Sequence, residues 1–442
     1  MGVVPLPPSK NPSEKRLCSS RESKQHARPD AEISLLTGGS DKPYAFGLAM
    51  ALVSKGLNID VLGSEEVSSP ELQATPNLNF LSLQGNKRPD ARPKEKVWRI
   101  LTYYGRLLHY ASSANSRVFH ILWNNKFQIF DRTLLMLYYK LHRKKIVLTV
   151  HNVNAAKRDS SDSLLNRLTL RIQYRLADHS FVHTQKMKRE LHDDFGVPER
   201  AVTVIPFGIN NSVPTTEVTI EQAKQRMGIK PGERTILFFG RIRPYKGLEY
   251  LVAAFQQIVA ANPAYRLIIA GEPMKETKTY LDEIQLTINR GIHRDRVIQK
   301  IQFIPDDETE LYFKAADVLV LPYKQIFQSG VLFLGYSFGL PVVATDVGSF
   351  KEEIVEGRTG FVCRPCDIKD LAKTIEKYFD SDLFKHLKSR RQEIREYANA
   401  QHSWDVVGEM TRNVYAQLLG RMHYESTSIH SHSCIQRTGM DR

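Results

Sequence analysis

The stretch that decides the fold is DVLVLPYKQIFQSGVLFLGYSFGLPVVATDVGSFKEEIVEGRTG, residues 317–360. It opens with the apolar run 318–321, which predicts a strand buried on both faces. A polar loop follows, and after Ser329 the apolar residues take the spacing of a helix. Gly339 ends this helix, and residues 342–344 predict a second strand. This order of elements forms one unit of a parallel sheet, and the N–H groups at such a helix start favour an anion, most often a phosphate.

The alternation of strand, turn and helix runs through the chain in two series. The first series opens with the strand 33–36 and the glycine turn at Gly38 and Gly39, followed by a helix and a second strand. This start resembles a Rossmann-like domain, whose glycine turn lies where ligands bind. The second series opens with the strand 235–239 and the basic, glycine-bounded loop 240–247. We therefore expect an α/β protein of two Rossmann-like domains that face a central cleft.

Breaks in this pattern predict where each part begins and ends. A polar stretch with one short helix separates the two series, and both ends of the chain are polar and lack periodicity. The expected parts are a disordered tail over residues 1–30, a first Rossmann-like domain over 31–212, a linker over 213–233, a second Rossmann-like domain over 234–400, a helix over 401–420 that returns to the first domain, and a disordered tail over 421–442.

The composition fits a soluble globular protein. A chain of 442 residues can hold two or three domains, and its 42% apolar and 25% charged residues lie in the usual range. No apolar run is long enough to span a membrane, and the first thirty residues lack the apolar core of a secretory signal. Four cysteines in a chain of this length favour a reducing compartment. These observations predict a cytoplasmic protein.

The formal net charge of +14 raises the question of an anionic partner. Between residues 94 and 145, basic side chains such as Arg99 and Arg106 alternate with aromatic ones such as Trp98 and Tyr104. Basic residues interleaved with aromatics suit an anionic membrane surface or another anionic ligand. A solvated basic face over ordinary core aromatics accounts for the same pattern. No common nucleic-acid-binding signature is present, so nucleic acid is not an expected partner.

Two loops carry the candidate functional side chains. Arg241 and Lys246 lie in the basic, glycine-bounded loop that follows the strand 235–239. His151 directly follows the strand 146–150, at the edge of the sheet where open α/β folds place ligands. Apart from any resemblance to a known family, a histidine in this position is more commonly a structural hydrogen-bonding group than a catalyst.

The order and spacing of several short motifs resemble one known family. The chain from residue 33 to residue 419 resembles the family 4 glycosyltransferases of the GT-B fold. On the donor side the similar segments are Gly240-Arg241-Ile242-x-x-x-Lys246-Gly247, Gly339-x-Pro341-Val342-Val343-Ala344, Val347-Gly348, Glu352 and Gly357-x-x-Gly360. On the acceptor side they are Thr149-Val150-His151-Asn152, Ala177-Asp178 and Ile205-Pro206-x-Gly208.

The resemblance implies a reaction and a set of residues. It implies transfer of a hexose from a nucleotide sugar to a glycan or lipid-linked acceptor, with retention of the anomeric configuration, in the synthesis of a surface polysaccharide or glycoconjugate. His151, Arg241 and Lys246 would act in catalysis, with His151 near the sugar. The donor-binding set would be Gly38, Gly39, Gly240, Ser329, Gly330, Val331 and Glu352. The resemblance implies no cofactor and no metal. Together with the basic and aromatic segment 94–145, the composition adds the expectation of a cytoplasmic protein that can lie on the inner face of the membrane.

One departure from the family pattern concerns the donor ribose. The family usually has two glutamates eight positions apart before the Gly-x-Pro-Val segment, and these positions hold Ile326 and Leu334 here. Neither side chain accepts a hydrogen bond, so the grip on the ribose would shift to the backbone near Ser329. Two alternatives therefore stay open: a non-catalytic nucleotide-sugar-binding protein or partner subunit, and a two-domain epimerase of the same fold.

Overall fold

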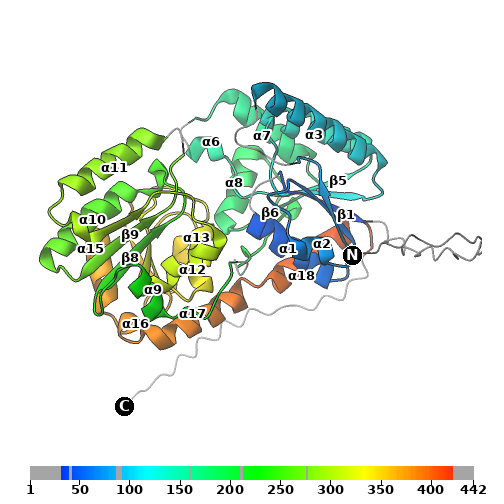
Figure 1. The fold of residues 1–442 in the computed structure, drawn as a ribbon. Helices are drawn as coiled ribbons and strands as arrows, with labels where there is room; N and C mark the ends of the chain where they lie inside the picture. The colour runs from blue at the N-terminus through cyan, green and yellow to red at the C-terminus, as the bar shows by residue number, and fades with distance from the viewer. Residues whose placement is uncertain are drawn as a thin grey trace, which may run out of the picture.

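The protein has two α/β domains that lie side by side (Figure 1). The predicted tails, apart from Arg421, and the candidate residue Gly39 lie outside the part of the chain that can be described. The computed structural model describes residues 31–38, 42–85, 92–158, 161–209, 213–274 and 277–421.

The first domain is built on a seven-stranded, all-parallel sheet in the order β3-β2-β1-β4-β5-β6-β7. The strand order reverses at β1 and β4, and such a reversal is where open α/β sheets bind ligands. The strands are β1 (Ile33–Leu36), β2 (Ile59–Gly63), β3 (Leu78–Ser82), β4 (Val118–Ile121), β5 (Lys145–Thr149), β6 (His179–Val182) and β7 (Val202–Val204).

Helices cover both faces of this sheet. One face packs on α1 (Lys42–Ser54) and α2 (Pro70–Ala74). Short elements, α6 (Ala155–Arg158) and η1 (Glu199–Ala201), lie in the loops. The other face packs on α3 (Pro93–Ser113), α4 (Gln128–Arg132), α5 (Leu134–Leu141), α7 (Leu164–Leu176) and α8 (Gln185–Phe195). Within the described ranges, no helix combines the length and the apolar content that crossing a membrane requires.

The second domain repeats the plan with a six-stranded parallel sheet in the order β10-β9-β8-β11-β12-β13. Its strands are β8 (Arg234–Phe239), β9 (Tyr265–Ala270), β10 (Val297–Lys300), β11 (Val318–Leu321), β12 (Val342–Thr345) and β13 (Gly360–Cys363). Its helices are α10 (Leu248–Ala261), α11 (Lys278–Arg290), α12 (Asp306–Ala315), α13 (Gly330–Ser337), α14 (Phe350–Glu353), α15 (Ile368–Asp380), α16 (Asp382–Lys385) and α17 (Leu387–Gln401), with short turns η2 (Pro244–Lys246) and η4 (Arg294–Arg296).

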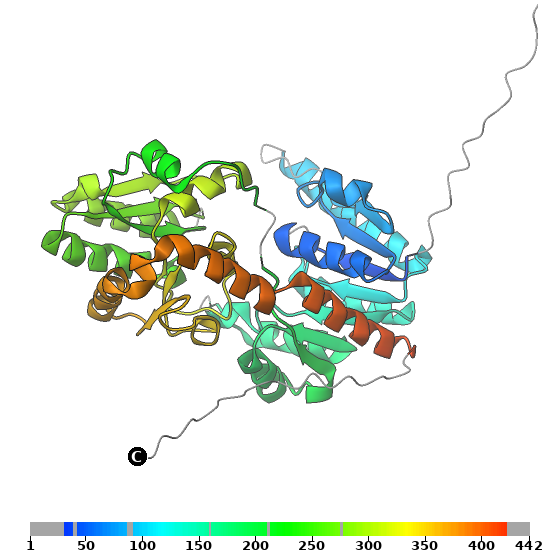
Figure 2. The same ribbon diagram turned by 90° about the horizontal axis from the view of Figure 1, so that it is seen from below.

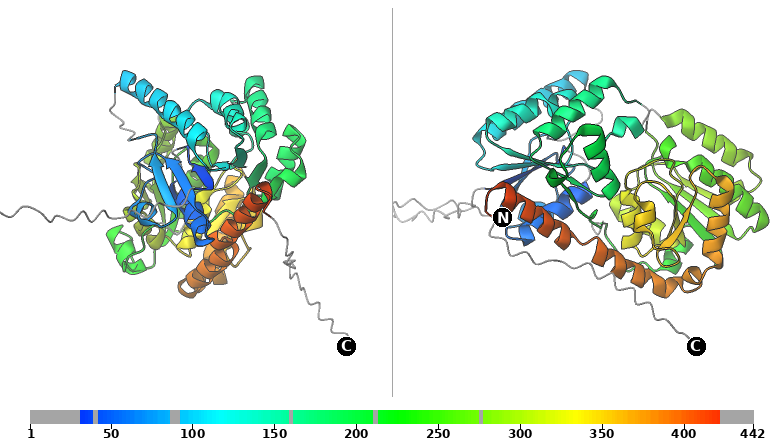
Figure 3. Two further views of the ribbon diagram at one scale, coloured as in Figure 1. Left: turned by 90° about the vertical axis from the view of Figure 1, so that its right-hand side faces the viewer. Right: turned by 180° about the vertical axis from the view of Figure 1, so that it is seen from behind.

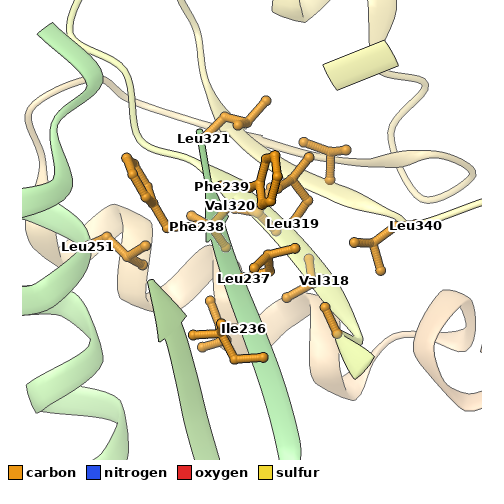
Figure 4. Close-up of a cluster of buried hydrophobic side chains, with 14 of the residues drawn as sticks. Ile236, Leu237, Phe238, Phe239, Leu251, Val318, Leu319, Val320, Leu321 and Leu340 are labelled. Atoms are coloured by element: carbon orange, nitrogen blue, oxygen red, sulfur yellow. The ribbon is translucent and has the colours of Figure 1, made fainter. Parts of the chain in front are cut away.

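The centre of the second core is formed by β8 and β11, which the sequence predicts from their apolar runs. Every residue of β11 is buried, as are residues 235–239 of β8. Figure 4 shows the side chains of both strands projecting to the two faces of the sheet. Parallel strands covered by helices on both faces need apolar side chains on both, which explains the unbroken apolar sequence.

The segment 213–233, predicted as a linker, lies on the second domain. Its short helix α9 (Ile220–Arg226) packs against α12, and Ala223 and Ile229 are buried in the second core. The Lys224 ammonium pairs with the Asp317 carboxylate at 2.7 Å. These contacts attach the segment to the domain that follows it.

The last helix, α18 (Trp404–Leu418), leaves the second domain and packs against α1 of the first. Figures 2 and 3 show α17 and α18 following each other across both domains. Glycines permit the close contact, because a Cβ on Gly47 would lie 2.1 Å from Trp404 Cε2 and one on Gly408 would lie 2.9 Å from Ala51 Cβ.

The chain crosses between the domains twice, and the two crossings are hydrogen-bonded to each other. The Ile209 N–H donates to the His402 carbonyl at 2.9 Å. The Trp404 indole N–H donates to the Ile209 carbonyl, also at 2.9 Å. A Cβ on Gly208 would lie 2.3 Å from Trp404 Cε2, so the indole fits between Gly208 and Gly47.

Candidate functional site

Both domains line an interdomain pocket next to these crossings. Pro43 and Tyr44 come from the start of α1, Gly330, Val331 and Leu334 come from α13, and Phe207, Gly208 and Trp404 come from the two crossings. The Phe207 ring stacks on Phe333 with centroids 5.2 Å apart. The pocket is therefore lined mostly by apolar groups. The polar residues that the sequence predicts for the site do not line it and are described next.

On the first domain, His151 follows β5 inside an aromatic cluster. Its ring stacks on Trp123 with centroids 4.3 Å apart and an angle of 4°, and the Tyr44 ring meets it edge-on at 4.7 Å. Its Nδ1 lies 3.3 Å from His183 Nε2. Burial, together with the neighbouring His183 and His120, holds the pKa of His151 well below its ordinary value. His151 is therefore neutral at physiological pH.

Gly38 supports this cluster from the end of β1. Its φ is +59°, and a Cβ there would lie 2.6 Å from the Trp123 carbonyl oxygen. Only glycine fits this position, which lets the β1 turn approach the residue on which His151 stacks. The predicted ligand-binding turn at Gly38 therefore lies against Trp123, a residue that the sequence analysis did not single out.

On the second domain, Lys246 ends the turn η2 and is buried, with an exposed fraction of 7%. Its Nζ lies 5.4 Å from the centre of the Tyr323 ring, and Gly240 leaves room for it, since a Cβ there would lie 3.2 Å from Nζ. No ion-pair partner of Lys246 is found among the described residues. Burial, with Arg243 and Arg241 nearby, lowers the pKa of Lys246 to about 7. A buried ammonium without a counterion is suited to an anionic ligand.

Arg241 lies in the same loop but is exposed. Its side chain is 63% exposed, and Nε is 3.6 Å from the Glu272 carboxylate. Such a loose, solvated pair is worth little, so the guanidinium can turn to a ligand at small cost.

The start of α13 completes the second-domain side. Ser329 is the N-cap but makes no side-chain cap bond, and its hydroxyl is buried beside the Tyr323 phenol, whose pKa burial raises. The first N–H groups of a helix lack intrahelical acceptors and so remain available to a ligand. The Val331 methyl would lie 3.4 Å from a Cβ on Gly240, so α13 and the basic loop come together.

Glu352 is placed apart from this group. It lies on α14, exposed, and no described contact links its carboxylate to the basic loop or to Ser329. Its helix does reach the site indirectly, because the Phe350 ring packs on Tyr323 at 5.5 Å. The structure therefore brings together Gly240, Lys246, Ser329 and Val331, with Gly330 beside them on the pocket.

The two positions that depart from the family pattern have apolar surroundings. Leu334 is 7% exposed and faces the interdomain pocket with Tyr44 and Trp404. Ile326 packs against the second core, and its carbonyl would lie 2.4 Å from a Cβ on Gly348. The side chains at both positions thus contribute packing.

Replacing Leu334 by glutamate is expected to destabilise the protein by about 2–4 kcal/mol at neutral pH, because the carboxylate would be desolvated without a partner. Burial would raise the pKa of the new carboxyl, so the loss should grow as pH rises above about 4 and shrink on acidification. The measurement is the free energy of unfolding at two pH values, with Leu334→Gln as an uncharged control. A pH-independent difference, or tighter nucleotide binding, would contradict this expectation.

His183 is a residue that sequence analysis missed. It follows β6 as His151 follows β5, and this shared position after neighbouring strands was the available signal. No metal is suggested by the histidines, since the described residues contain no group of three or more His, Cys, Asp or Glu that could hold one.

The chain matches two models of known protein families. The family model described as Glycosyltransferase Family 4 matches residues 43–213, and the one described as Glycosyl transferases group 1 matches residues 219–401. A D-inositol 3-phosphate glycosyltransferase of Corynebacterium efficiens is 21% identical over 370 residues, which cover 81% of this chain and 86% of that protein.

Solved structures share the fold. A sucrose-phosphate synthase from Thermosynechococcus elongatus superposes with a TM-score of 0.70 at 18% identity, covering 89% of this chain and all of that one. Anabaena HepE, solved in complex with UDP and glucose, gives a TM-score of 0.68 at 17% identity over 87% of this chain and all of that one. The chain therefore belongs to the family 4 glycosyltransferases and is a transferase of the GT-B fold.

Proposed function

We propose that this glycosyltransferase is a retaining, metal-independent hexosyltransferase that acts on a nucleotide sugar. The acceptor is a glycan or a lipid-linked molecule in the synthesis of a surface polysaccharide or glycoconjugate. The observation that carries the proposal is Lys246, a buried ammonium without a described counterion, beside the N-terminus of α13. A pyrophosphate group suits this place in charge and in hydrogen-bonding capacity.

The proposed reaction uses these groups in named roles. The bond between sugar C1 and the donor phosphate oxygen breaks with its electron pair leaving on the phosphate. The acceptor oxygen bonds to C1 on the same face and passes its proton to a donor phosphate oxygen. Lys246, Arg241 and the α13 N–H groups offset the charge that grows on the leaving group, the role that a metal ion has in other transferases. Neutral His151 contacts the sugar.

A donor panel tests the proposal and separates it from the alternatives. UDP- and GDP-hexoses are the first probes, since the similar HepE binds UDP. We expect one of these nucleotide sugars to bind. Its nucleotide should be released when membrane lipid extract is added, and excess EDTA should not reduce this release. Binding without release would favour the non-catalytic alternative, and conversion of the donor without any acceptor would favour an epimerase. Strict dependence on a divalent cation would refute metal independence.

Binding of UDP at about pH 8.5 is expected to take up about one proton, because the anion restores the pKa of Lys246 from about 7 toward its ordinary value. Between these two pKa values the free protein is mostly deprotonated at Nζ and the complex mostly protonated. Calorimetry in buffers of different ionisation enthalpy measures the uptake. Lys246→Met should abolish it, and an equal uptake in that variant would assign the proton to another group.

The proposed lipid-linked acceptor is supported by an apolar face on the first domain. Large apolar side chains stand exposed on the helices that cover one side of the sheet; Trp98 is 72% exposed and Leu164 is 86% exposed. We define this apolar face by Val97, Trp98, Leu101, Ile129, Leu134, Leu137, Leu141, Leu164, Leu165 and Leu168. Exposed apolar side chains gathered on α3, α4, α5 and α7, which cover one side of the sheet, suit an interaction surface.

The basic residues of this region divide into two groups. Lys144 is buried and donates to the carbonyls of Ala114 and Ser116, while Lys140 and Lys145 pair with Asp178. These three ammonium groups serve contacts within the fold. Exposed cations on the helices of the apolar face and in their flanking loops include Lys94, Arg106, Lys126, Arg143 and Arg171. Apolar side chains among exposed cations suit an anionic bilayer, so we propose peripheral association with the inner face of the membrane.

Vesicles with anionic lipid are expected to bind the full-length protein at low salt and to release it as ionic strength rises, since each basic residue near the surface contributes about 1 kcal/mol. Serine at Leu164, Leu165 and Leu168 should weaken binding at every salt concentration, because apolar contact is not screened. Ile292→Ser is the matched control, because Ile292 is 92% exposed on the other domain. Absence of a bound fraction on co-sedimentation at low salt would rule out this association.

A further inference from the structure

The rings of His151 and His183 form a pair whose protons can be placed from geometry. Strands β5 and β6 are parallel, with Thr149 opposite Phe181. Two residues further along, the same register brings His151 beside His183, and their Nδ1 and Nε2 atoms lie 3.3 Å apart. Each histidine lies two residues beyond the last residue pair of the β5–β6 ladder, so backbone pairing itself sets the contact.

The proton positions follow from the contact that His183 makes on the side away from His151. His183 Nδ1 lies 3.3 Å from the Ile205 carbonyl oxygen, which can only accept, so Nδ1 carries a proton. Burial lowers the pKa of His183 to about 4, so the ring is neutral and its Nε2 is bare. His151 Nδ1 faces that bare nitrogen and therefore donates to it. His151 is also neutral, which leaves its Nε2 without a proton.

The His151 end of the pair is unsatisfied. His151 Nε2 is buried and has no hydrogen-bond partner among the described residues. The rings that pack on His151 are those of Trp123, Tyr44 and Phe207, and they hold the imidazole plane in place. A buried acceptor without a partner costs free energy unless a ligand supplies the donor.

We infer that His183 is a positioning residue that fixes the tautomer of His151, so that His151 Nε2 accepts a hydrogen bond from a hydroxyl of the transferred sugar. This inference rests on the proposed function, because it names the group that meets the donor sugar. It excludes His151 as a proton donor to the leaving group. It also predicts selection for sugars that carry a hydroxyl at this point, since a deoxy analogue leaves Nε2 unpaired.

The first test needs no substrate. Full-length protein labelled with 15N-histidine is examined by NMR, and the His151 signals are assigned by their loss in His151→Phe. We expect a pyrrole-type Nδ1 and a pyridine-type Nε2 for His151 in the wild type. In His183→Leu, which removes the acceptor, a fraction of His151 should change to the other tautomer. A protonated Nε2 in the wild type, or an unchanged pattern in His183→Leu, overturns the inference.

The second test uses the reaction. His183→Leu should lower kcat/KM by about 10–100-fold, as loss of a supporting hydrogen bond commonly does. His183→Gln, whose amide oxygen can replace Nε2 as acceptor, should recover most of this loss. Equal losses in both variants would show a packing role and overturn the inference. If no donor binds at all, the proposed function fails while the NMR result still decides the tautomer.

Discussion

Replacing Lys246 by methionine is expected to lower kcat/KM by about 10²–10³-fold, the usual effect of removing one preorganised group that stabilises transition-state charge. The side chain is buried next to Gly240 and the start of α13, where a phosphate would meet several donors at once. Low local dielectric strengthens that contact, and methionine keeps the volume while removing the charge. The measurement is steady-state nucleotide release by the purified variant.

The same substitution should leave the fold intact and make it more stable. A buried ammonium without a partner is costly, and replacing such a charge by an apolar side chain is commonly stabilising by about 1–4 kcal/mol. The direction in which the stability of the wild type changes with pH follows from the pKa of Lys246. Because the folded pKa of Lys246 is about 7, below its unfolded value, the unfolded chain binds more protons between these values. Wild-type stability should therefore rise with pH in this window, and that of Lys246→Met should not.

Lys324→Met is the matched control. Its ammonium lies in the neighbouring loop, paired with the Glu249 carboxylate at 2.9 Å. Removal of this partly exposed pair should change stability by less than about 1 kcal/mol and leave turnover close to that of the wild type. Near-normal kcat/KM in Lys246→Met would place the phosphate elsewhere in the cleft.

Replacing Trp404 by alanine is expected to cost about 3–5 kcal/mol of stability, the range for large aromatic truncations in packed sites. The indole fills the space between Gly47 and Gly208, its N–H bonds the Ile209 carbonyl, and its ring meets Tyr44 at 5.2 Å. All of these contacts join α18 to the first domain. Besides a lower denaturation midpoint, we expect the single unfolding transition to broaden or split, because the contact between the domains is weakened.

Trp98→Ala is the control for Trp404→Ala, because it makes the same substitution at an exposed position. Trp98 is 72% exposed on the apolar face, so its loss should change stability by no more than about 0.5 kcal/mol. It should instead weaken vesicle binding. If the two tryptophan variants unfold at the same denaturant concentration, the role given to Trp404 is wrong.

The fold could be predicted from the sequence where burial alone decides it. Residues 318–321 and 342–344 are predicted as strands because helices on both faces of a parallel sheet demand apolar side chains, and β11 and β12 lie there. Strand ends were less certain. Apolar residues recur as far as Ile304, yet the strand β10 ends at Lys300.

The site was less predictable because it depends on which residues of separate elements meet. Lys246 and Arg241 look alike in sequence as charges of one loop, yet one is buried and the other exposed. The difference arises from η2, which turns Lys246 under the Tyr323 ring. Both histidines follow predicted strands, but their partnership depends on the register of β5 against β6, which the sequence of neither strand reveals by itself. Trp404, which lines the pocket, comes from the far end of the chain.

The paired crossings have a mechanical consequence. Two bodies joined at two nearby points can rotate about the line through them but cannot slide past each other. Here the points are Ile209 and His402, held together by one backbone hydrogen bond. We therefore expect opening and closing of the cleft to follow a single angular coordinate, with His151 on one domain and Lys246 on the other. One pair of distance labels, placed on the outer ends of the two domains, would therefore report the whole motion.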